Sequence, residues 1–334
     1  MDFMINIDLK KASKQINYND RLLLMGSCFT EHIGHSLEEL KFPVLQNPNG
    51  ILFDTNSVCR SLVSYIRNRQ YNEKDFFLLN QVWHSWDHHS RYSNTDLNEA
   101  IKKINSSQLC AHDFLKKAGW VVITLGSSFS YRLNDQAVKT AGSLENSGVA
   151  NCHRAPAQWF AKYLMTVNEM TADLQNCLDL LFEFNPALNI LFTVSPVRHI
   201  RDGVVENNRS KSRLIETVHH LAGKYENVFY FPSYEIVIDV LRDYRFYDAD
   251  LVHPNYMATE FVLEKFIEVY IEDAAKKIMQ EVRDIVIARN HKAFQPETAS
   301  HKQFLKTYYD KVRTLKQIYP FLDLDNELNY FKDS

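Results

Sequence analysis

Short runs of apolar residues alternate along the chain with longer segments in which apolar positions recur every three or four residues. The runs predict buried strands, because a strand covered on both faces shows no polar alternation. Five strands are expected, at residues 21–25, 42–46, 120–125, 189–194 and 228–231. The segment 30–40, with Ile33, Leu37 and Leu40 on one side, is typical of the helices between them. Strands that alternate with helices indicate βαβ units and a parallel sheet.

Other segments predict the elements around this sheet. They are an insertion over 71–118, a hairpin over 129–140, and helices over 156–183, 254–289 and 299–318. The insertion combines aromatic residues, a histidine cluster and helical stretches. We therefore predict an α/β protein with a three-layer, flavodoxin-like arrangement of about five parallel strands and a helical C-terminal extension.

Composition removes several classes of function. The formal net charge is −3 and no long run of Lys or Arg occurs, so a nucleic-acid partner is not expected. No apolar stretch approaches the roughly 18 residues of a membrane span, and the N-terminus lacks a signal-peptide core. The five cysteines are scattered and form no C-x-x-C pair, which is typical of reduced thiols. We expect a cytoplasmic protein with no nucleic-acid or membrane partner.

Candidate chemistry lies where the strands end, because ligands of such sheets bind at the carboxyl ends of the strands. Ser27 follows Gly26 at the end of the first strand and starts a helix, which suits a nucleophile or an ordinary N-cap. In the last loop, Asp250 precedes His253 by three residues, a spacing that lets the carboxylate orient the imidazole as a base. Asp248 is a rival for the orienting role. These residues together indicate a catalytic triad.

An acyl-transfer site also needs hydrogen-bond donors for the oxyanion. Asn49 and Gly50, after the second strand, offer a side-chain amide and a backbone N–H. Gly126 and Ser128, after the third strand, are the second candidates. A glycine-bearing turn without a catalytic role is an equally natural interpretation of the first pair.

Several segments resemble the GSCFA family. Residues 24–30 read Leu-Met-Gly-Ser-Cys-Phe-Thr, with Thr30 where the family's name has alanine. The similarity continues in segments 47–53, 124–126, 151–154, 193–199, 202–203 and 250–254. This family is grouped with the SGNH, or GDSL-like, hydrolases, so the resemblance implies a three-layer α/β/α SGNH-hydrolase fold. It also implies hydrolysis or transfer of an acyl ester, often on a carbohydrate.

The resemblance assigns roles to four residues. It makes Ser27 the nucleophile and Gly50 an oxyanion donor. It makes Asp250 and His253 the rest of the triad. The leading function is removal of an acyl group, acetyl first, from an ester. The alternatives are an O-acyltransferase that uses the same triad, and a non-catalytic relative that binds a carbohydrate or a partner.

One block departs from the superfamily pattern. Its usual G-x-N-D sequence reads Gly126-Ser-Ser-Phe here, so the oxyanion asparagine is missing. Asn49, Ser128 and Asn151 are the candidates to replace it, and the sequence does not choose between them. A weak or inactive enzyme is expected if no residue does.

The resemblance and the helical pattern together predict the domain organisation. One GSCFA/SGNH-like domain is expected over residues 1–270, with the insertion at 71–118 inside it. A helical extension over 271–334 is expected to pack on this domain. Its part beyond Ala299 is most simply an amphipathic packing helix, with a homodimer interface as the alternative.

The remaining polar residues suggest weaker alternatives. Cys28 follows Ser27 directly, and a small buried residue is favoured over a thiolate nucleophile. A set of zinc-ligand types lacks complete ligand spacing: His32, His35, His84, Asp87, His88 and His89. We therefore predict no metal and no cofactor. Arg154, Arg198 and His199 fall in loops where an anionic substrate could bind, with ordinary loop hydrogen bonds as the favoured alternative. The expected partner is a small-molecule or saccharide ester.

Overall fold

The computed structural model describes residues 5–137 and 148–333, which form two compact units. One unit contains residues up to 8 together with 21–34 and 45–263. The other contains residues 9–20, 35–44 and 264 onward. The division is therefore not a single cut in the chain, because two N-terminal segments belong to the unit that holds the C-terminal helices.

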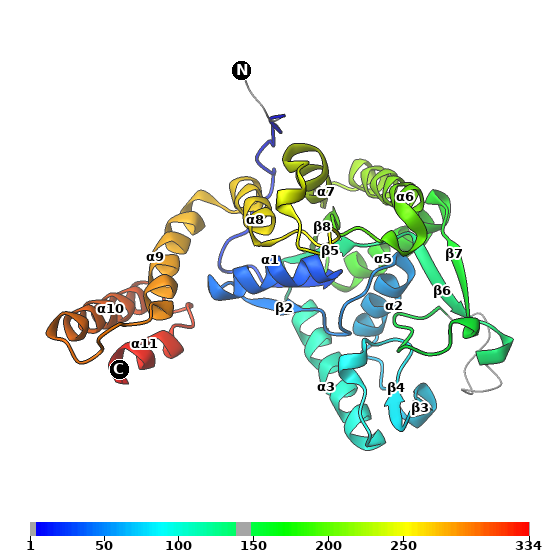
Figure 1. Ribbon diagram of the computed structural model, residues 1–334, viewed down its shortest axis with the longest axis horizontal. Coiled ribbons are helices and arrows are strands. Elements are labelled where there is room, and N and C mark those ends of the chain that lie inside the picture. The colour runs from blue at the N-terminus through cyan, green and yellow to red at the C-terminus, as the bar shows by residue number, and fades with distance from the viewer. Residues whose placement is uncertain (1–4, 138–147, 334) are drawn as a thin grey trace. The chain divides into compact units, whose positions relative to one another are not determined.

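The first unit is built on a five-stranded parallel sheet (Figure 1). Its strands are β1 Leu22–Gly26, β2 Val44–Gln46, β5 Trp120–Leu125, β8 Asn189–Val194 and β9 Val228–Phe231. Their order, β2-β1-β5-β8-β9, is the flavodoxin-like order 2-1-3-4-5, so the predicted fold class is confirmed. Gly26 pairs with Thr124, and Thr124 pairs with Thr193, so the central strands end at one common edge.

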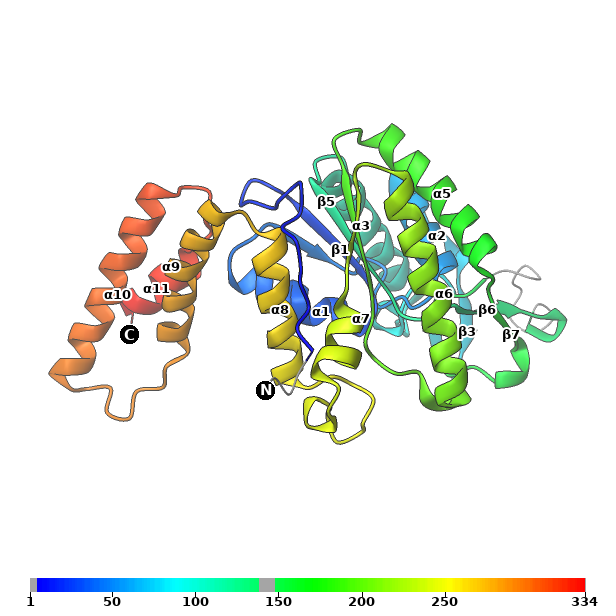
Figure 2. The ribbon, with the colours of Figure 1, turned by 90° about the horizontal axis from the view of Figure 1, so that it is seen from above.

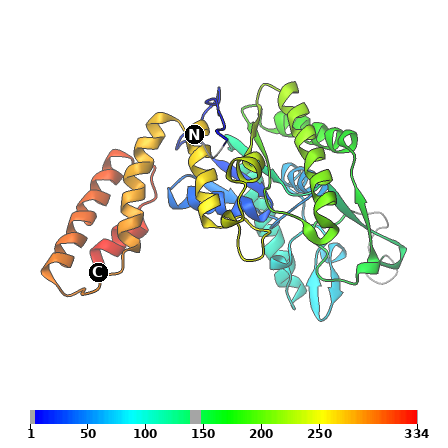
Figure 3. The ribbon, with the colours of Figure 1, turned by 45° about the horizontal axis from the view of Figure 1, so that its top comes forward.

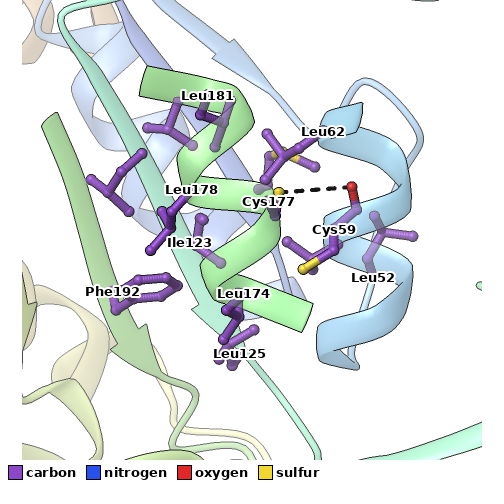
Figure 4. Close-up of a cluster of buried hydrophobic side chains, with 14 of the residues drawn as sticks. Leu52, Cys59, Leu62, Ile123, Leu125, Leu174, Cys177, Leu178, Leu181 and Phe192 are labelled. Atoms are coloured by element: carbon purple, nitrogen blue, oxygen red, sulfur yellow. Dashed lines mark hydrogen bonds between the residues drawn. The ribbon is translucent and has the colours of Figure 1, made fainter. Parts of the chain in front are cut away.

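Four helices share one face of this sheet. They are α2 Thr55–Ile66, α3 Leu97–Leu115, α5 Val167–Phe184 and α6 Gly203–Lys224. Figure 4 shows Leu174 and Leu178 of α5 packed beside Ile123 and Phe192 of the strands. Burying each such side chain contributes roughly 1.5–3 kcal/mol. Residues 28–34 of α1 and 256–263 of α8 lie on the other side of the sheet (Figure 2). The full bounds of these two helices are Cys28–Glu39 and Tyr256–Tyr270.

Two expectations in the middle of the chain are wrong. The strand β6 Phe129–Leu133 pairs with β7 Phe160–Leu164 and not with the residues just after it. Residues 138–140 of the expected hairpin lie outside the described residues. The helix expected from residue 156 begins only at Val167, because Thr166 and Glu169 cap each other's backbone N–H groups there. The sequence pattern did not distinguish the half-exposed strand β7 from the first turns of a helix.

The insertion contains the hairpin of β3 Phe77–Leu79 and β4 Val82–His84, followed by α3. Downstream, β9 leads into the short helix α7 Ser233–Glu235, which continues as a π-helix over Ile236–Leu241. The single helix expected over 254–289 is two helices, because Ile271 leaves the helix to form a β-bridge with Ile16.

The second unit contains three helices that lie side by side (Figure 3). They are α9 Asp273–Asn290, α10 Ala299–Ile318 and α11 Asp325–Asp333. Glu327 is fully buried in this unit and accepts hydrogen bonds from Lys41 at 2.9 Å and Arg289 at 2.6 Å. The two cations offset the cost of burying the carboxylate. Across residues 5–137 and 148–333, no helix has the length and apolar character needed to cross a membrane.

Candidate active site

Ser27 lies at the junction of β1 and α1, on the carboxyl edge of the sheet. Gly26 makes this junction, since its φ is +128° and a Cβ atom there would lie 2.1 Å from the Thr124 carbonyl oxygen. The Gly26 N–H donates to Asn47 Oδ1 at 2.9 Å, and the Ser27 N–H donates to the Thr124 carbonyl at 3.1 Å. These contacts with the neighbouring strand fix where the serine sits.

The hydroxyl of Ser27 is buried and has no hydrogen-bond partner among the described residues. A buried hydroxyl left unpaired costs about 1–3 kcal/mol, so an atom of this kind calls for a functional explanation. The hydrogen bond from serine to histidine that a triad implies is therefore not formed in the described part of the chain.

Asp250 and His253 meet within one turn. Asp250 Oδ2 lies 2.6 Å from His253 Nδ1, and Asp250 Oδ1 accepts the N–H groups of His253 at 3.0 Å and Val252 at 2.9 Å. These hydrogen bonds, the backbone N–H of His253 first, lower the pKa of Asp250 to about 2. Asp248 meets His253 through its backbone N–H, 2.8 Å from the His253 carbonyl. The geometry therefore favours Asp250 as the residue that orients the imidazole.

The loop after β8 is tied to this turn by Arg198. The Arg198 N–H donates to the Val252 carbonyl at 3.2 Å, and its guanidinium donates to the Leu251 carbonyl at 3.3 Å. The guanidinium also lies 4.2 Å from the centre of the Tyr247 ring. Arg198 thus holds the turn that contains Asp250 and His253, and its role in substrate binding stays a prediction.

His199 follows Arg198 and packs beside Gly126. Its N–H donates to Asn207 Oδ1 at 2.8 Å, and its ring meets Phe53 edge-on at 5.7 Å. A methyl group built on Gly126 would lie 3.5 Å from His199 Nε2. This nitrogen is buried and has no partner among the residues that the structure describes. Burial first, and then the nearby Lys211, lower the pKa of His199 to about 4, so the imidazole is neutral at pH 7.

Lys211 of α6 is buried beneath the same loops. Its Nζ donates to the carbonyls of Gly126 and Ser195, both at 2.6 Å. Burial lowers the pKa of Lys211 to about 7. Sequence reasoning missed this residue, although it falls on the same helical stripe as the buried Leu214 and Val218. A lysine at a position of the helix where apolar residues are expected could have indicated a buried lysine.

The side chain of Asn49, predicted to supply an oxyanion donor, is buried in the core, which argues against that role. Its side chain is 1% exposed, and its Nδ2 donates to Ser61 Oγ at 3.0 Å and to the Asp87 carbonyl at 3.3 Å. Its Oδ1 accepts from Tyr65 at 3.0 Å and from Gln108 at 3.1 Å. All of its hydrogen-bonding capacity is used inside the core, so Asn49 is a structural residue.

Ser128, the second predicted donor, is engaged in the core in the same way. It is fully buried and its Oγ donates to the Ser210 carbonyl at 3.2 Å. The N–H of Gly50 donates to the Asn47 carbonyl at 2.7 Å. The N–H of Gly126 donates to the Phe53 carbonyl, in the loop after β2, at 2.8 Å. The glycine donors expected from the sequence are therefore already engaged within the protein, as is the N–H of Ser27.

Asn151 is hydrogen-bonded beside the histidine cluster, and its role as an oxyanion donor stays a prediction. Asn151 Oδ1 accepts the His153 N–H at 2.8 Å and the Ser90 hydroxyl at 3.3 Å. His88 is 1% exposed, lies 3.1 Å from Ser85 Oγ through Nδ1, and has a pKa that burial lowers to about 3. Within the described ranges, no group of three or more His, Cys, Asp or Glu residues is placed to hold a metal.

Cys28 does not have the character of an activated thiolate. Burial raises the pKa of Cys28 above its ordinary value, although the N–H groups of Phe29 and of Cys28 itself oppose this. A protonated thiol is a poor nucleophile. The geometry therefore favours Ser27 over its neighbour.

A cavity of about 780 Å³ lies elsewhere in the unit, beside α2 and α5. Its lining includes Arg60, Tyr71, Asp87 and Cys177, and none of the three residues predicted to form a triad. Arg60 binds Asp87 there at 2.5 Å. The chemistry and this cavity are separate features of the molecule.

Among solved structures, the chain is distantly similar to a carbohydrate esterase family 3 protein from Talaromyces cellulolyticus and to the acetyl xylan esterase Est2A from Butyrivibrio proteoclasticus. The first is 10% identical, with a TM-score of 0.36, over 79% of this chain and 99% of the other. The second is 11% identical, with a TM-score of 0.37, over 75% of this chain and 63% of the other. No curated protein sequence matches.

Family models match both parts of the chain. Residues 282–334 match the C-terminal domain of GSCFA domain proteins. Residues 21–266, well over half of the chain, match the model of the GSCFA family. The chain therefore belongs to the GSCFA family.

Proposed function

We propose that this protein is a serine esterase that removes an acyl group, acetyl first, from an ester substrate. The observation that carries the proposal is the 2.6 Å contact between His253 Nδ1 and Asp250 Oδ2, in a loop at the sheet edge where Ser27 is buried with an unpartnered hydroxyl. A carboxylate on Nδ1 fixes the ring and leaves Nε2 to accept a proton, which is what a general base requires.

The proposed reaction has two steps. In the first, Ser27 Oγ attacks the ester carbonyl while His253 Nε2 takes the hydroxyl proton. The tetrahedral intermediate collapses, the ester C–O bond breaks, and His253 returns the proton to the leaving alcohol. In the second, water attacks the acyl-enzyme and gives a proton to His253. The acid then leaves and Ser27 regains its proton. Both steps require His253 Nε2 to reach Ser27 Oγ in the substrate complex.

The surface beside His253 supports a saccharide ester as the substrate class. Tyr244 is 64% exposed and Tyr256 is 75% exposed, and both flank the catalytic turn in the sequence. Tyr244 packs on Tyr247, which forms a β-bridge with Pro254, next to His253. The apolar faces of sugar rings stack on exposed aromatic rings of this kind.

The test is ester turnover by the purified protein. We expect release of 4-nitrophenol from 4-nitrophenyl acetate and of acetate from an acetylated oligosaccharide. We expect Ser27→Ala to lose at least 10³-fold of both rates. Acetate that appears mainly on an added saccharide acceptor would identify an acyltransferase. Absence of turnover with either ester, with no change in Ser27→Ala, would favour the non-catalytic relative.

A further inference from the structure

The proposed esterase lacks an assigned donor for the negative charge that develops on the carbonyl oxygen. The Asn49 and Ser128 side chains are committed to the core. The N–H groups of Ser27, Gly50 and Gly126 donate to protein carbonyls. Removing one oxyanion donor typically costs an enzyme 10²–10³-fold in kcat, so the site needs a donor that is not already engaged.

Buried polar atoms without a partner show where such a donor can be. Two of them in the described residues are Ser27 Oγ and His199 Nε2. Both residues follow strands of the same parallel sheet, β1 and β8, which flank β5. A buried ring nitrogen left unpaired costs free energy that a bound substrate group can recover.

We propose that His199 is a catalytic residue whose Nε2–H donates a hydrogen bond to the oxyanion, in place of the asparagine that the superfamily carries after the third strand. The inference rests on the proposed function, because it names a further group for the same reaction. It requires the neutral tautomer of the imidazole with its proton on Nε2.

His199 lies beside Gly126, the first residue of the segment in which the superfamily's asparagine is missing. His199 Nε2 lies 3.5 Å from where a side chain on Gly126 would begin, beside Phe53 at 3.3 Å, so the face of this glycine without a side chain is the face that His199 and Phe53 approach. Gly26 pairs with Thr124 in the sheet register, so Ser27 and Gly126 follow neighbouring strand ends. The Arg198 N–H also donates to the Val252 carbonyl. Arg198 directly precedes His199 and Val252 directly precedes His253, so this hydrogen bond joins the loops of the two histidines.

The surroundings of His199 fit a donor better than a second base. Among the described residues, no carboxylate hydrogen-bonds to its ring in the way that Asp250 does to His253. Asn207 and Phe53 hold its backbone and its ring instead. Burial and the neighbouring Lys211 disfavour its protonation, so the imidazole stays neutral at pH 7. A neutral imidazole is an effective electrophile toward a developing alkoxide.

The experiment compares substitutions that keep a donor with one that does not. We expect His199→Leu to lower kcat for 4-nitrophenyl acetate by about 10²-fold, with KM changed less than about threefold, because an oxyanion donor acts in the transition state. His199→Gln, which carries an N–H donor on a side chain of similar reach, should recover at least tenfold of that loss. A trifluoromethyl ketone should bind His199→Leu more weakly by a similar factor.

A second variant tests the same geometry without touching the imidazole. Gly126→Ala adds a methyl group 3.3 Å from the Phe53 ring and carbonyl and 3.5 Å from His199 Nε2, at a residue without a positive φ. We expect it to lower kcat by tenfold or more, while the midpoint of thermal unfolding falls by no more than a few degrees because Phe53 must shift slightly. The matched control is Thr55→Val, which removes another buried hydroxyl without a partner among the described residues, at the start of α2 and outside the proposed site. It should leave kcat within about threefold.

The outcomes separate the inference from the proposed function. If a fluorophosphonate labels wild-type Ser27 and the wild type hydrolyses the ester, the proposed function stands. A His199→Leu variant with unchanged kcat then overturns the role of His199 alone. A His199→Gln variant as inactive as His199→Leu also overturns it, since a base is not replaced by an amide. A wild type that is neither labelled nor active ends both proposals.

Discussion

Two buried polar clusters at the sheet edge, built around Asn49 and around Ser27, differ in one respect. Every hydrogen-bonding group of the Asn49 side chain is satisfied, by Ser61, Tyr65, Gln108 and a backbone carbonyl. The Ser27 hydroxyl has no partner among the described residues. A satisfied buried network stabilises a fold, whereas an unsatisfied one costs stability and is kept where a ligand completes it. The comparison assigns the first cluster to structure and the second to chemistry.

The largest effect on kcat is expected from removing members of the proposed triad. We expect Ser27→Ala and His253→Ala each to lower kcat by about 10⁴-fold, and the double variant to be little worse, because the two residues act as a unit. Asp250→Asn should be equally harmful or milder. Ser27→Ala should unfold at the wild-type denaturant midpoint or slightly above it, since it removes an unpaired buried hydroxyl. Multiplicative losses in the double variant would contradict a shared step.

Asn49→Ala should do the reverse. It leaves the Tyr65 hydroxyl and the Gln108 amide without their acceptor, and we expect a loss of about 2–4 kcal/mol in the free energy of unfolding. Among folded molecules, kcat should change less than about threefold. Urea unfolding and ester turnover at a temperature below the transition measure the two effects. A fall in kcat with unchanged stability would move Asn49 back into the active site.

Part of this arrangement was readable from the sequence. The apolar runs located all five strands of the sheet, because a strand buried on both faces has few polar residues. The Asp250–His253 contact was also predictable, since three residues of separation determine it locally. The strand pairing of 160–164 with 129–133 was not, because it joins residues about thirty positions apart across a loop.

The oxyanion donors could not be identified from the sequence. Motif position suggested Asn49 and Ser128, but whether an amide or a hydroxyl is already bonded depends on residues distant in the chain, such as Gln108 and Ser210. His199 lies in a segment that resembles the family, where the sequence indicates only a loop residue that could bind an anion. Its unpartnered nitrogen is a property of packing and not of spacing.

A smaller effect concerns Lys211 beneath the site. Burial lowers its pKa to about 7, whereas in the unfolded chain it returns to its ordinary value near 10.5. Between these values the unfolded state binds more protons, so Lys211 makes the free energy of unfolding rise with pH, by up to about 1.4 kcal/mol per pH unit.

Lys211→Met should remove this contribution. We expect the gain in the wild-type free energy of unfolding between pH 7.5 and 9.5 to exceed that of Lys211→Met. Urea unfolding at the two pH values measures it, and groups common to both proteins cancel in the difference. Parallel pH dependences in the two proteins would mean that Lys211 is charged in the folded state throughout this range.

The most direct test of the account is to identify the residue that a fluorophosphonate modifies. The purified protein is treated with the reagent, digested, and its labelled peptide sequenced by mass spectrometry, with Ser27→Ala and His253→Ala treated in parallel. The account predicts modification of Ser27 in the wild type, none in Ser27→Ala, and labelling slowed at least 10²-fold in His253→Ala. Modification of Cys28 or of another serine, or no modification of a folded wild-type protein, would contradict it.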